Sequence, residues 1–426
     1  MAEDEREVPS GRWGRLTRLA GAGARASAGM LLRGSGEQAA KKAAEVLGTL
    51  RGVATKAGQM AAYVDGLVPE EQRETYELWM KGLMAAAPKS SSAAIRLEVE
   101  AQLQASIDEL FADWQDDALA SASIGQVHRA RLHDGREVAV KVQHPGIAEA
   151  MESDLKNVGL LEHFAALAGS RKFDSQQVLR EFRERMREEL DYALEAERQE
   201  AFRAIHADDL TIRIPEVVRS HCAPRVLTTE LVRAQNFDAA CAASEDERRR
   251  WAETMWRFVF KGTLVGGMFN ADPHPGNYLF DADGKVWFLD FGCVQAQDMS
   301  RRDLALAVHR AAILRDEASF RASVTELLGT RGGDYERWAL DYVRRCFEPL
   351  FASPFRITRP YAATMVEGIR NIAKAAPRLK KDEVVPLPEG MFFMNRLQCG
   401  FYSVLARLDV EVDYAAVERD FLTSEF

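Results

Sequence analysis

The sequence contains the run Asn-Ala-Asp-Pro-His-Pro-Gly-Asn at Asn270–Asn277, followed downstream by Leu-Asp-Phe-Gly at Leu289–Gly292. In the first segment Asp272 precedes Asn277 by five residues, and in the second Asp290 precedes a flexible glycine. Phosphoryl transfer needs these residue types: a carboxylate near the acceptor, and an asparagine and a second carboxylate that hold the metal. The spacing predicts Asp272 beside the transferred group, and Asn277 and Asp290 on magnesium.

A lysine earlier in the chain completes this set. Val-Ala-Val-Lys at Val138–Lys141 places Lys141 on a predicted strand, where kinases have the lysine that contacts the α- and β-phosphates. Each member alone says little, because Asp-Phe-Gly is commonly a turn and a strand lysine is commonly solvated. Together, and in the order of a kinase chain, they favour a phosphotransfer site.

The lysine of such a site is oriented by a glutamate on a following helix. The charged segment Ser175–Ala207 is predicted to be one helix, and Glu195 is the preferred partner of Lys141. Other glutamates of the same helix stay open as alternatives: Glu188, Glu189, Glu197 and Glu200.

Alternating apolar and polar residues predict strands around Lys141. Gly125–Leu132 and Glu137–Gln143 form a predicted hairpin joined by a His-Asp-Gly-Arg turn, and Val226–Leu231 is a further short strand. The segment before them, Glu37–Trp114, has a helical pattern rich in Ala, Leu, Glu and Lys. The small part of the protein is therefore expected to combine a sheet with helices.

After Glu245 the chain is predicted to be helical, interrupted once by a small hairpin of Tyr278–Phe280 and Lys285–Asp290. We therefore expect an α+β protein with a bilobed protein-kinase-like fold and an N-terminal helical extension. The predicted boundaries are residues 1–36 for a basic flexible or amphipathic leader, 37–115 for the helical extension, 116–235 for the small lobe and 236–426 for the helical large lobe.

Composition excludes several other classes. The 426 residues, 47% of them hydrophobic, can bury a large core, and a net charge of −9 argues against general affinity for nucleic acid. The five cysteines lie far apart without a Cys-x-x-Cys pair, so neither a disulfide framework nor a zinc site is indicated, and a reducing cytoplasm fits best. No window has about eighteen consecutive apolar residues, so a membrane-spanning helix is not expected.

Peripheral contact with a membrane is a separate expectation. Residues 8–36 hold five arginines and no carboxylate, interleaved with Trp, Leu and Met. This composition suits either a flexible leader or a segment that lies on an anionic membrane surface, and the sequence leaves both open.

Four segments resemble the UbiB (AarF-like) family of atypical kinases. They are Lys56-Ala57-Gly58-Gln59, the run Ala120–His128, Glu189–Tyr192 with Glu195-Ala196, and the pair Asp272–Asn277 and Asp290–Gly292. The resemblance spans about residues 48–292 and is specific, because the first three segments are not general kinase motifs.

The resemblance implies roles for further residues. An alanine-rich loop would cover the phosphates where other kinases use glycine, here Ala120, Ser121, Ala122 and Ser123, and such a loop is stiffer than a glycine-rich one. The segment that joins the lobes would meet adenine through Glu230 and Val232. A helix with Lys56 and Gln59 would lie across the site, meet Glu189 and Asp191, and block protein substrates.

The expected function is that of an atypical kinase or ATPase with ATP and Mg²⁺ as cofactors. The family resemblance implies ATP hydrolysis or small-molecule phosphorylation in isoprenoid-quinone or other lipid metabolism at a membrane surface, with a lipid or quinone precursor as a further ligand. Two alternatives stay open: a non-hydrolysing, nucleotide-switched lipid-binding or scaffold protein, and a phosphotransferase of the aminoglycoside or choline type.

Overall fold

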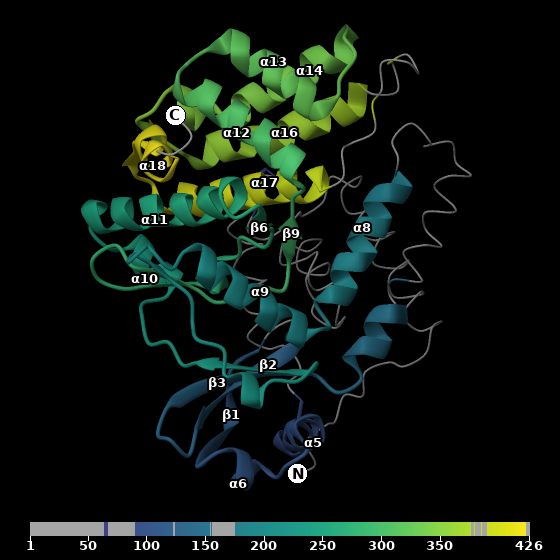
Figure 1. The fold of residues 1–426 in the computed structure, drawn as a ribbon, viewed down its shortest axis with the longest axis vertical. Coiled ribbons are helices and arrows are strands. Elements are labelled where there is room, and N and C mark those ends of the chain that lie inside the picture. Colours follow the sequence, from purple (N-terminus) through teal and green to yellow (C-terminus); the bar gives the residue numbers. More distant parts are fainter. Residues whose placement is uncertain are drawn as a thin grey trace, which may run out of the picture.

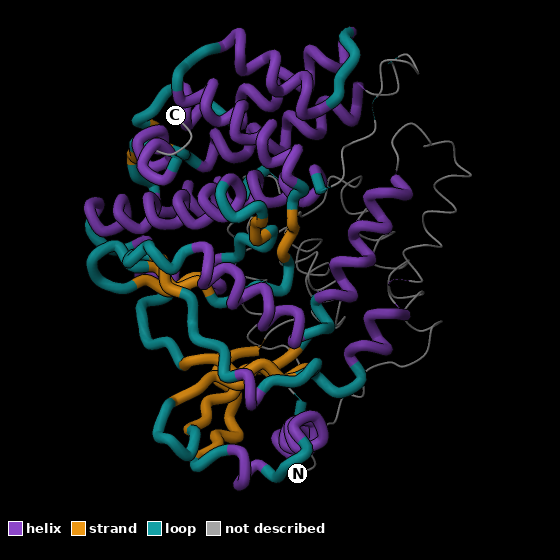
Figure 2. The backbone as a smooth tube through the Cα atoms, viewed as in Figure 1, coloured by secondary structure: helices purple, strands orange, loops and turns teal. Residues whose placement is uncertain are grey.

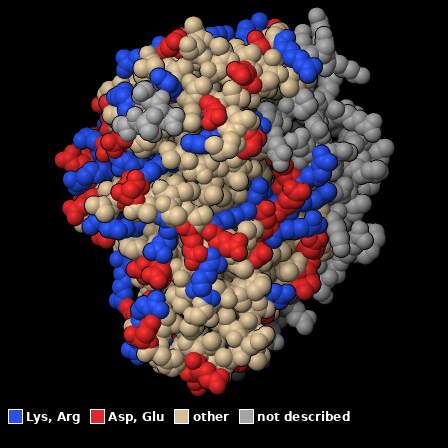
Figure 3. All heavy atoms as spheres, viewed as in Figure 1, with Lys and Arg blue, Asp and Glu red and all other residues tan. Residues whose placement is uncertain are grey.

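The computed structural model describes residues 64–66, 90–121, 124–153, 155, 175–375, 379, 385 and 390–422. Figure 1 shows a small lobe with a β-sheet and a large lobe of packed helices, which is the expected bilobed arrangement. None of the described helices is long and apolar enough to cross a membrane. On the face drawn in Figure 3, acidic and basic side chains are interspersed rather than separated by sign.

The small lobe is built on an antiparallel sheet in the order β1-β2-β3-β5. Its strands are β1 (Asp113–Ser121), β2 (Gly125–Arg131), β3 (Glu137–Gln143) and β5 (Val226–Glu230), so the predicted hairpin and the further strand are confirmed. Because side chains alternate along a strand, Val138, Val140 and Val142 enter the core on one face of β3. Ala139 and Lys141 then face the cleft between the lobes.

Two short helices cover the apolar face of this sheet. They are α5 (Ser92–Leu103), which packs Ile95 and Val99 against β3, and α6 (Ile107–Leu110). The prediction of helix as far as Trp114 is wrong, because β1 begins at Asp113. In β1 the Trp114 ring stacks on His128 of β2 at 5.1 Å, a cross-strand contact that favours the extended backbone.

The charged segment beyond the sheet forms two helices and not one. α8 (Ser175–Glu188) ends before Glu189, and α9 (Tyr192–Ile205) begins after Asp191. The Asp191 carboxylate accepts hydrogen bonds from the backbone N–H groups of Ala193 and Leu194, which is an N-cap that starts a new helix. The predicted single helix over Ser175–Ala207 is therefore corrected to a break followed by a separately oriented α9.

The large lobe is mainly helical, as the purple tube of Figure 2 shows. Its central helix is α11 (Glu245–Leu264), which begins at the capping box of Ser244 and Glu247 and buries Trp251 and Trp256. The other helices are α10 (Phe237–Cys241), α12 (Met299–Ile313), α13 (Glu317–Leu328), α14 (Gly333–Cys346), α15 (Glu348–Phe351), α16 (Arg359–Ala375), α17 (Met391–Leu408) and α18 (Tyr414–Phe421).

The predicted hairpin of this lobe is confirmed as β7 (Tyr278–Phe280) and β8 (Val286–Phe288). The expectation of only one interruption is wrong, because β6 (Met268–Asn270) pairs with β9 (Val294–Ala296). Further short strands are β4 (Ile212–Arg213), parallel to β8, and the pair β10 (Phe355–Arg356) and β11 (Glu411–Val412). Strands of two or three residues are too short to show an alternating pattern in the sequence.

Candidate active site between the lobes

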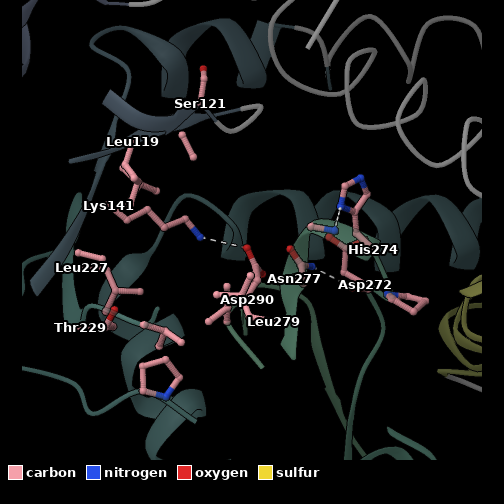
Figure 4. Close-up of a pocket in the computed structure, with 18 of the residues that line it drawn as sticks. Leu119, Ser121, Lys141, Leu227, Thr229, Asp272, His274, Asn277, Leu279 and Asp290 are labelled. Carbon is pink, nitrogen blue, oxygen red and sulfur yellow. Dashed lines mark hydrogen bonds and ion pairs between the residues drawn. The ribbon is translucent and has the colours of Figure 1, made fainter. Parts of the chain in front are cut away.

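A cleft of about 420 Å³ lies between the lobes. One wall comes from the sheet, with Leu119, Ser121 and Lys141, and the facing wall comes from the large lobe, with Asn277 and Asp290, as Figure 4 shows. Predicted site residues from several distant segments of the chain therefore line the same cleft. They are Ala120, Ser121, Lys141, Glu230, Val232, Asp272, Asn277 and Asp290.

Lys141 joins the two lobes through carboxylates. Its Nζ lies 2.8 Å from Oε1 of Glu195 on α9 and 3.1 Å from Oδ2 of Asp290 in the large lobe. The Glu195 side chain is 2% exposed, whereas that of Asp290 is 29% exposed and faces the cleft. The predicted pairing of Lys141 with Glu195 is confirmed, and the break before α9 is what allows this helix to point its first turn at β3.

The alternative glutamates have other positions. Glu188 forms ion pairs with Arg185 and Arg198, and Glu200 pairs with Arg219 on the surface of the small lobe. Glu197 is exposed on α9. Only Glu195, among the glutamates on α9, is both buried and within hydrogen-bond distance of Lys141.

The charges of this cluster depend on one another. Burial works to lower the pKa of Lys141, but the carboxylates of Asp290 and Glu195 outweigh it and raise that pKa well above its usual value. Lys141 therefore stays a cation. Burial raises the pKa of Glu195, against the opposing effects of Lys141 and of the Phe291 backbone N–H, which donates to it.

The loop Asn270–Asn277 is held in place by amide side chains. Asn270 Nδ2 donates to the carbonyl oxygen of Asp290 at 2.5 Å, and Asn270 Oδ1 accepts from the Asp272 N–H at 3.1 Å. Asn277 Nδ2 donates to the Asp272 carbonyl at 3.1 Å. Asn270 thus ties the two motifs together, a role that the sequence reasoning missed; its position two residues before Asp272 was the available signal.

His274 and Phe291 stabilise the two loops that carry the predicted site residues. His274 Nδ1 accepts from the Gly276 N–H at 3.0 Å, so this histidine braces the loop. Phe291 is fully buried and contacts the rings of Phe202 on α9 and Phe258 on α11, at centroid distances of 5.2 and 6.4 Å. The ring beside Asp290 therefore packs against both α9 and α11.

An arginine from far along the chain also reaches the loop. Arg396 on α17 places Nη2 2.7 Å from Asp272 Oδ1, with side chains 7% and 16% exposed. One turn later on the same face, Gly400 lets the helix approach closely, because a Cβ there would lie 2.6 Å from Cγ of Pro273. Sequence reasoning missed Arg396, and nothing in the residues around it signals this contact.

The predicted phosphate-covering loop begins at the end of β1, with Ala120 and Ser121. Ala120 and Ser121 line the cavity, and the Ser121 hydroxyl is shielded from solvent without a hydrogen-bond partner among the described residues. Ala122 and Ser123 lie outside the described residues. Gly125 at the start of β2 has no room for a side chain, since a Cβ would lie 2.4 Å from the Val142 carbonyl oxygen.

The segment that joins the lobes forms an apolar slot at the back of the cleft. Glu230, Leu231 and Val232 line it, together with Ala139 and Leu279 from the opposite walls. The backbone N–H groups of Glu230 and Leu231 are used inside the protein, where they donate to the carbonyls of Glu216 and Glu137. A flat heterocycle could therefore not receive hydrogen bonds from these two N–H groups.

The two carboxylates expected to hold a cover over the site differ in exposure. Glu189 is buried close to the cleft, 3.8 Å from the position of a Cβ on Gly292, whereas Asp191 is exposed and caps α9. Lys56 and Gln59, like the arginine-bearing segment 8–36, lie outside the described residues. Their predicted contacts therefore stay predictions.

Comparisons with known proteins agree on the family. Residues 82–324, more than half of the chain, match the model of the ABC1 atypical kinase-like domain. The chain is 29% identical over 385 residues to the atypical kinase COQ8B, mitochondrial, of Rattus norvegicus, covering 88% of this chain and 70% of the relative. It is 26% identical over 373 residues to the atypical kinase coq-8, mitochondrial, of Caenorhabditis elegans, covering 85% of this chain and 48% of the relative.

Other matches extend the comparison. An uncharacterised Mycobacterium tuberculosis protein is 31% identical over 283 residues, which are 65% of this chain and 57% of the relative. The chain thus spans between about half and 70% of the relatives described here. The solved complex of Rv3197 with erythromycin from M. tuberculosis has a TM-score of 0.61 and 26% identity, over 88% of this chain and 94% of that one. The protein-kinase-like fold and the resemblance drawn from the motifs are confirmed, and the chain belongs to the ABC1 (UbiB, AarF-like) family of atypical kinase-like proteins.

Proposed function

We propose that the cleft binds ATP with Mg²⁺ and that the protein transfers the terminal phosphoryl group to water or to a small molecule. The observation that carries this proposal is the cluster of Lys141, Glu195 and Asp290. A lysine kept charged between a buried glutamate and a partly exposed aspartate is the arrangement that phosphate binding and metal binding require.

The remaining lining of the cleft fits these cofactors. The slot beside Val232 suits a flat apolar base, and the hydroxyl of Ser121, which has no hydrogen-bond partner among the described residues, can donate to a phosphate oxygen. Asn277 and Asp290 offer oxygen atoms, the ligands that Mg²⁺ prefers. Bound Mg²⁺ would neutralise charge on the phosphate oxygens.

Each residue of the chain then has a proposed role. Lys141 would donate to the α- and β-phosphates while Glu195 keeps its side chain in place. Asp272 would accept a hydrogen bond from the acceptor hydroxyl or water, and Arg396 fixes the direction of its carboxylate. Glu230 and Val232 would contact adenine through groups other than the N–H of Glu230.

The acceptor is proposed to be small rather than a protein. Relatives that carry the name atypical kinase cover most of this chain, and the family resemblance points to isoprenoid-quinone or other lipid metabolism at a membrane surface. We retain the proposal that Lys56 and Gln59 contact Glu189 and Asp191 and cover the site. Residues 8–36 are the proposed membrane contact.

The test measures Mg-ATP binding and turnover on the whole chain. Asp290→Asn should abolish the magnesium-dependent part of the thermal stabilisation by ATP, because an uncharged amide binds Mg²⁺ more weakly than a carboxylate does and the phosphates then lose the cation that neutralises them. Asp283→Asn is the matched control, since Asp283 is 85% exposed on the hairpin turn, and it should behave like the parent. Equal stabilisation of all three proteins by Mg-ATP would remove Asp290 from the metal site.

Turnover separates the two classes of function. Phosphate release from ATP, measured with and without anionic liposomes, should be lost in Asp290→Asn and retained in Asp283→Asn. Magnesium-dependent binding without any phosphate release or phosphorylated product, under both conditions, would favour the nucleotide-switched lipid-binding or scaffold protein.

A further inference from the structure

The large lobe has a second cavity, of about 290 Å³ and open to solvent, among α12, α13, α14, α16 and α17. Figure 1 shows these helices packed together at the end of the molecule remote from the sheet. No described residue lines both this cavity and the cleft between the lobes. Small-molecule sites are commonly concave, mainly apolar pockets between helices, which is the character of this cavity.

The wall of the cavity is almost entirely hydrocarbon. Val308, Val324 and Ala339 line it from three helices and are buried, and Met391 and Met394 line it from α17. Methionine side chains are flexible and polarisable and adapt to ligands of different shape. Such a wall favours a ligand made mainly of carbon and hydrogen.

No lysine, arginine, aspartate or glutamate is among the described residues that line this cavity. His309 lines the cavity and can become a cation. Its Nδ1 lies 2.8 Å from Oε2 of the fully buried Glu418. That histidine is already paired within the core. The cavity therefore offers no counter-ion to a charged ligand, which points to a neutral one.

One end of the cavity is polar. The Tyr342 hydroxyl donates to Oδ1 of Asn395 at 3.0 Å, which leaves the NH₂ group of Asn395 as the donor for another partner. Gln398 lies one turn further along the same face of α17 and also lines the cavity. The two amides lie together on α17, whereas most of the other lining residues are hydrocarbon, so the site has one polar wall.

We propose that this cavity binds a neutral, mainly hydrocarbon molecule that carries one hydroxyl or carbonyl oxygen, with that oxygen at Asn395 and Gln398. An apolar cavity of about 150 Å³ holds benzene, so twice that volume suits a molecule of roughly ten carbon atoms. Ile369 lines the cavity and is 37% exposed, which places an apolar residue where the ligand can enter. The proposal does not depend on nucleotide binding.

Geraniol, a ten-carbon prenyl alcohol, is a suitable probe. Calorimetric titration into the whole chain, without nucleotide, should show saturable binding to one site, accompanied by a rise in melting temperature. Ala339→Phe fills the cavity from α14 and should abolish this binding. Ala318→Phe makes the same substitution at an exposed position of α13 and should bind geraniol as the parent does.

A second variant tests the polar end and does not rely on filling the cavity. Asn395→Leu should bind geraniol about fivefold more weakly, the loss typical of one neutral hydrogen bond, and should bind myrcene, a ten-carbon hydrocarbon without the hydroxyl, as the parent does. If Ala339→Phe does not fold, this comparison alone decides the proposal.

Three results would overturn the proposal. The first is no saturable binding of geraniol to the parent, and the second is equal binding to the parent and to folded Ala339→Phe. The third is an equal effect of Asn395→Leu on geraniol and on myrcene, which would contradict the assigned orientation. Because nucleotide is absent throughout, none of these results bears on the proposed ATP site.

Discussion

Replacing Arg396 by methionine should destabilise the protein, and the size of the effect should depend on Asp272. The two side chains are joined by a contact of 2.7 Å between Nη2 and Oδ1, with 7% and 16% of their surfaces exposed. Methionine keeps much of the volume of the arginine stem but removes the charge. The half-buried Asp272 carboxylate then loses the cation that offsets its removal from water.

The magnitude follows from the burial. Two unit charges about 4 Å apart attract by about 4 kcal/mol at an effective dielectric constant near 20, and desolvation of both groups offsets part of this. Breaking a fully buried ion pair costs about 3–5 kcal/mol. Because Asp272 faces the cleft, where water can reach it, we expect Arg396→Met to cost about 2 kcal/mol, which is less than for a fully buried pair.

A double-mutant cycle in urea separates this pair from general effects of the substitution. Arg396→Met, Asp272→Asn and the double variant should show a coupling free energy of at least about 1.5 kcal/mol, because each single change leaves one charge without the other. Arg419→Met is the control, since Arg419 is 50% exposed and 4.0 Å from Asp413, and it should change stability by less than about 0.5 kcal/mol. Additive effects of the two single variants would refute the proposed stabilising ion pair between Arg396 and Asp272.

Further predictions follow from crowding, burial and charge. Gly125→Ala should cost about 3 kcal/mol, because its Cβ would lie 2.4 Å from the Val142 carbonyl oxygen and 2.8 Å from the Tyr192 hydroxyl; an unchanged urea midpoint would contradict this. Burial, aided by Lys261, lowers the pKa of His206 to about 3. Between about pH 6.5 and that value the unfolded chain binds a proton that the folded chain does not, so His206 contributes a loss of stability of up to about 1.4 kcal/mol per unit as pH falls. His206→Phe should flatten this slope in urea unfolding at pH 7, 6 and 5, and parallel slopes would count against it. Glu195→Gln should reduce the thermal shift with Mg-ATP by removing the charge that orients the lysine, whereas an unaltered shift would make Glu195 purely structural.

Local sequence patterns identified the parts of the site that lie on regular strands or in compact motifs. Lys141 was predictable because β3 alternates clearly, and Asp272, Asn277 and Asp290 because each stands at a fixed place in a short run. Glu195 could be selected among several glutamates, but its burial against Lys141 was not visible in the pattern.

Other features were set by contacts between distant segments. The break at Glu189–Asp191 depends on whether Asp191 continues one helix or caps the next, and both states fit a charged helical pattern. Pairing of β6 with β9 comes from hydrogen bonds between strands of three residues, a length that carries no periodicity. Arg396 acts across 124 positions of sequence, so only the packing of α17 reveals its contact with Asp272.

The buried Phe291 also bears on how the cleft could be inhibited. A compound that occupied the space of this aromatic ring would first have to displace the ring into water. Here that ring is fully buried against Phe202 and Phe258, so its exposure to water would cost about 2–3 kcal/mol before any such compound made a contact. Selective inhibitors are better sought among flat molecules that fill the slot beside Val232 and leave Phe291 in place.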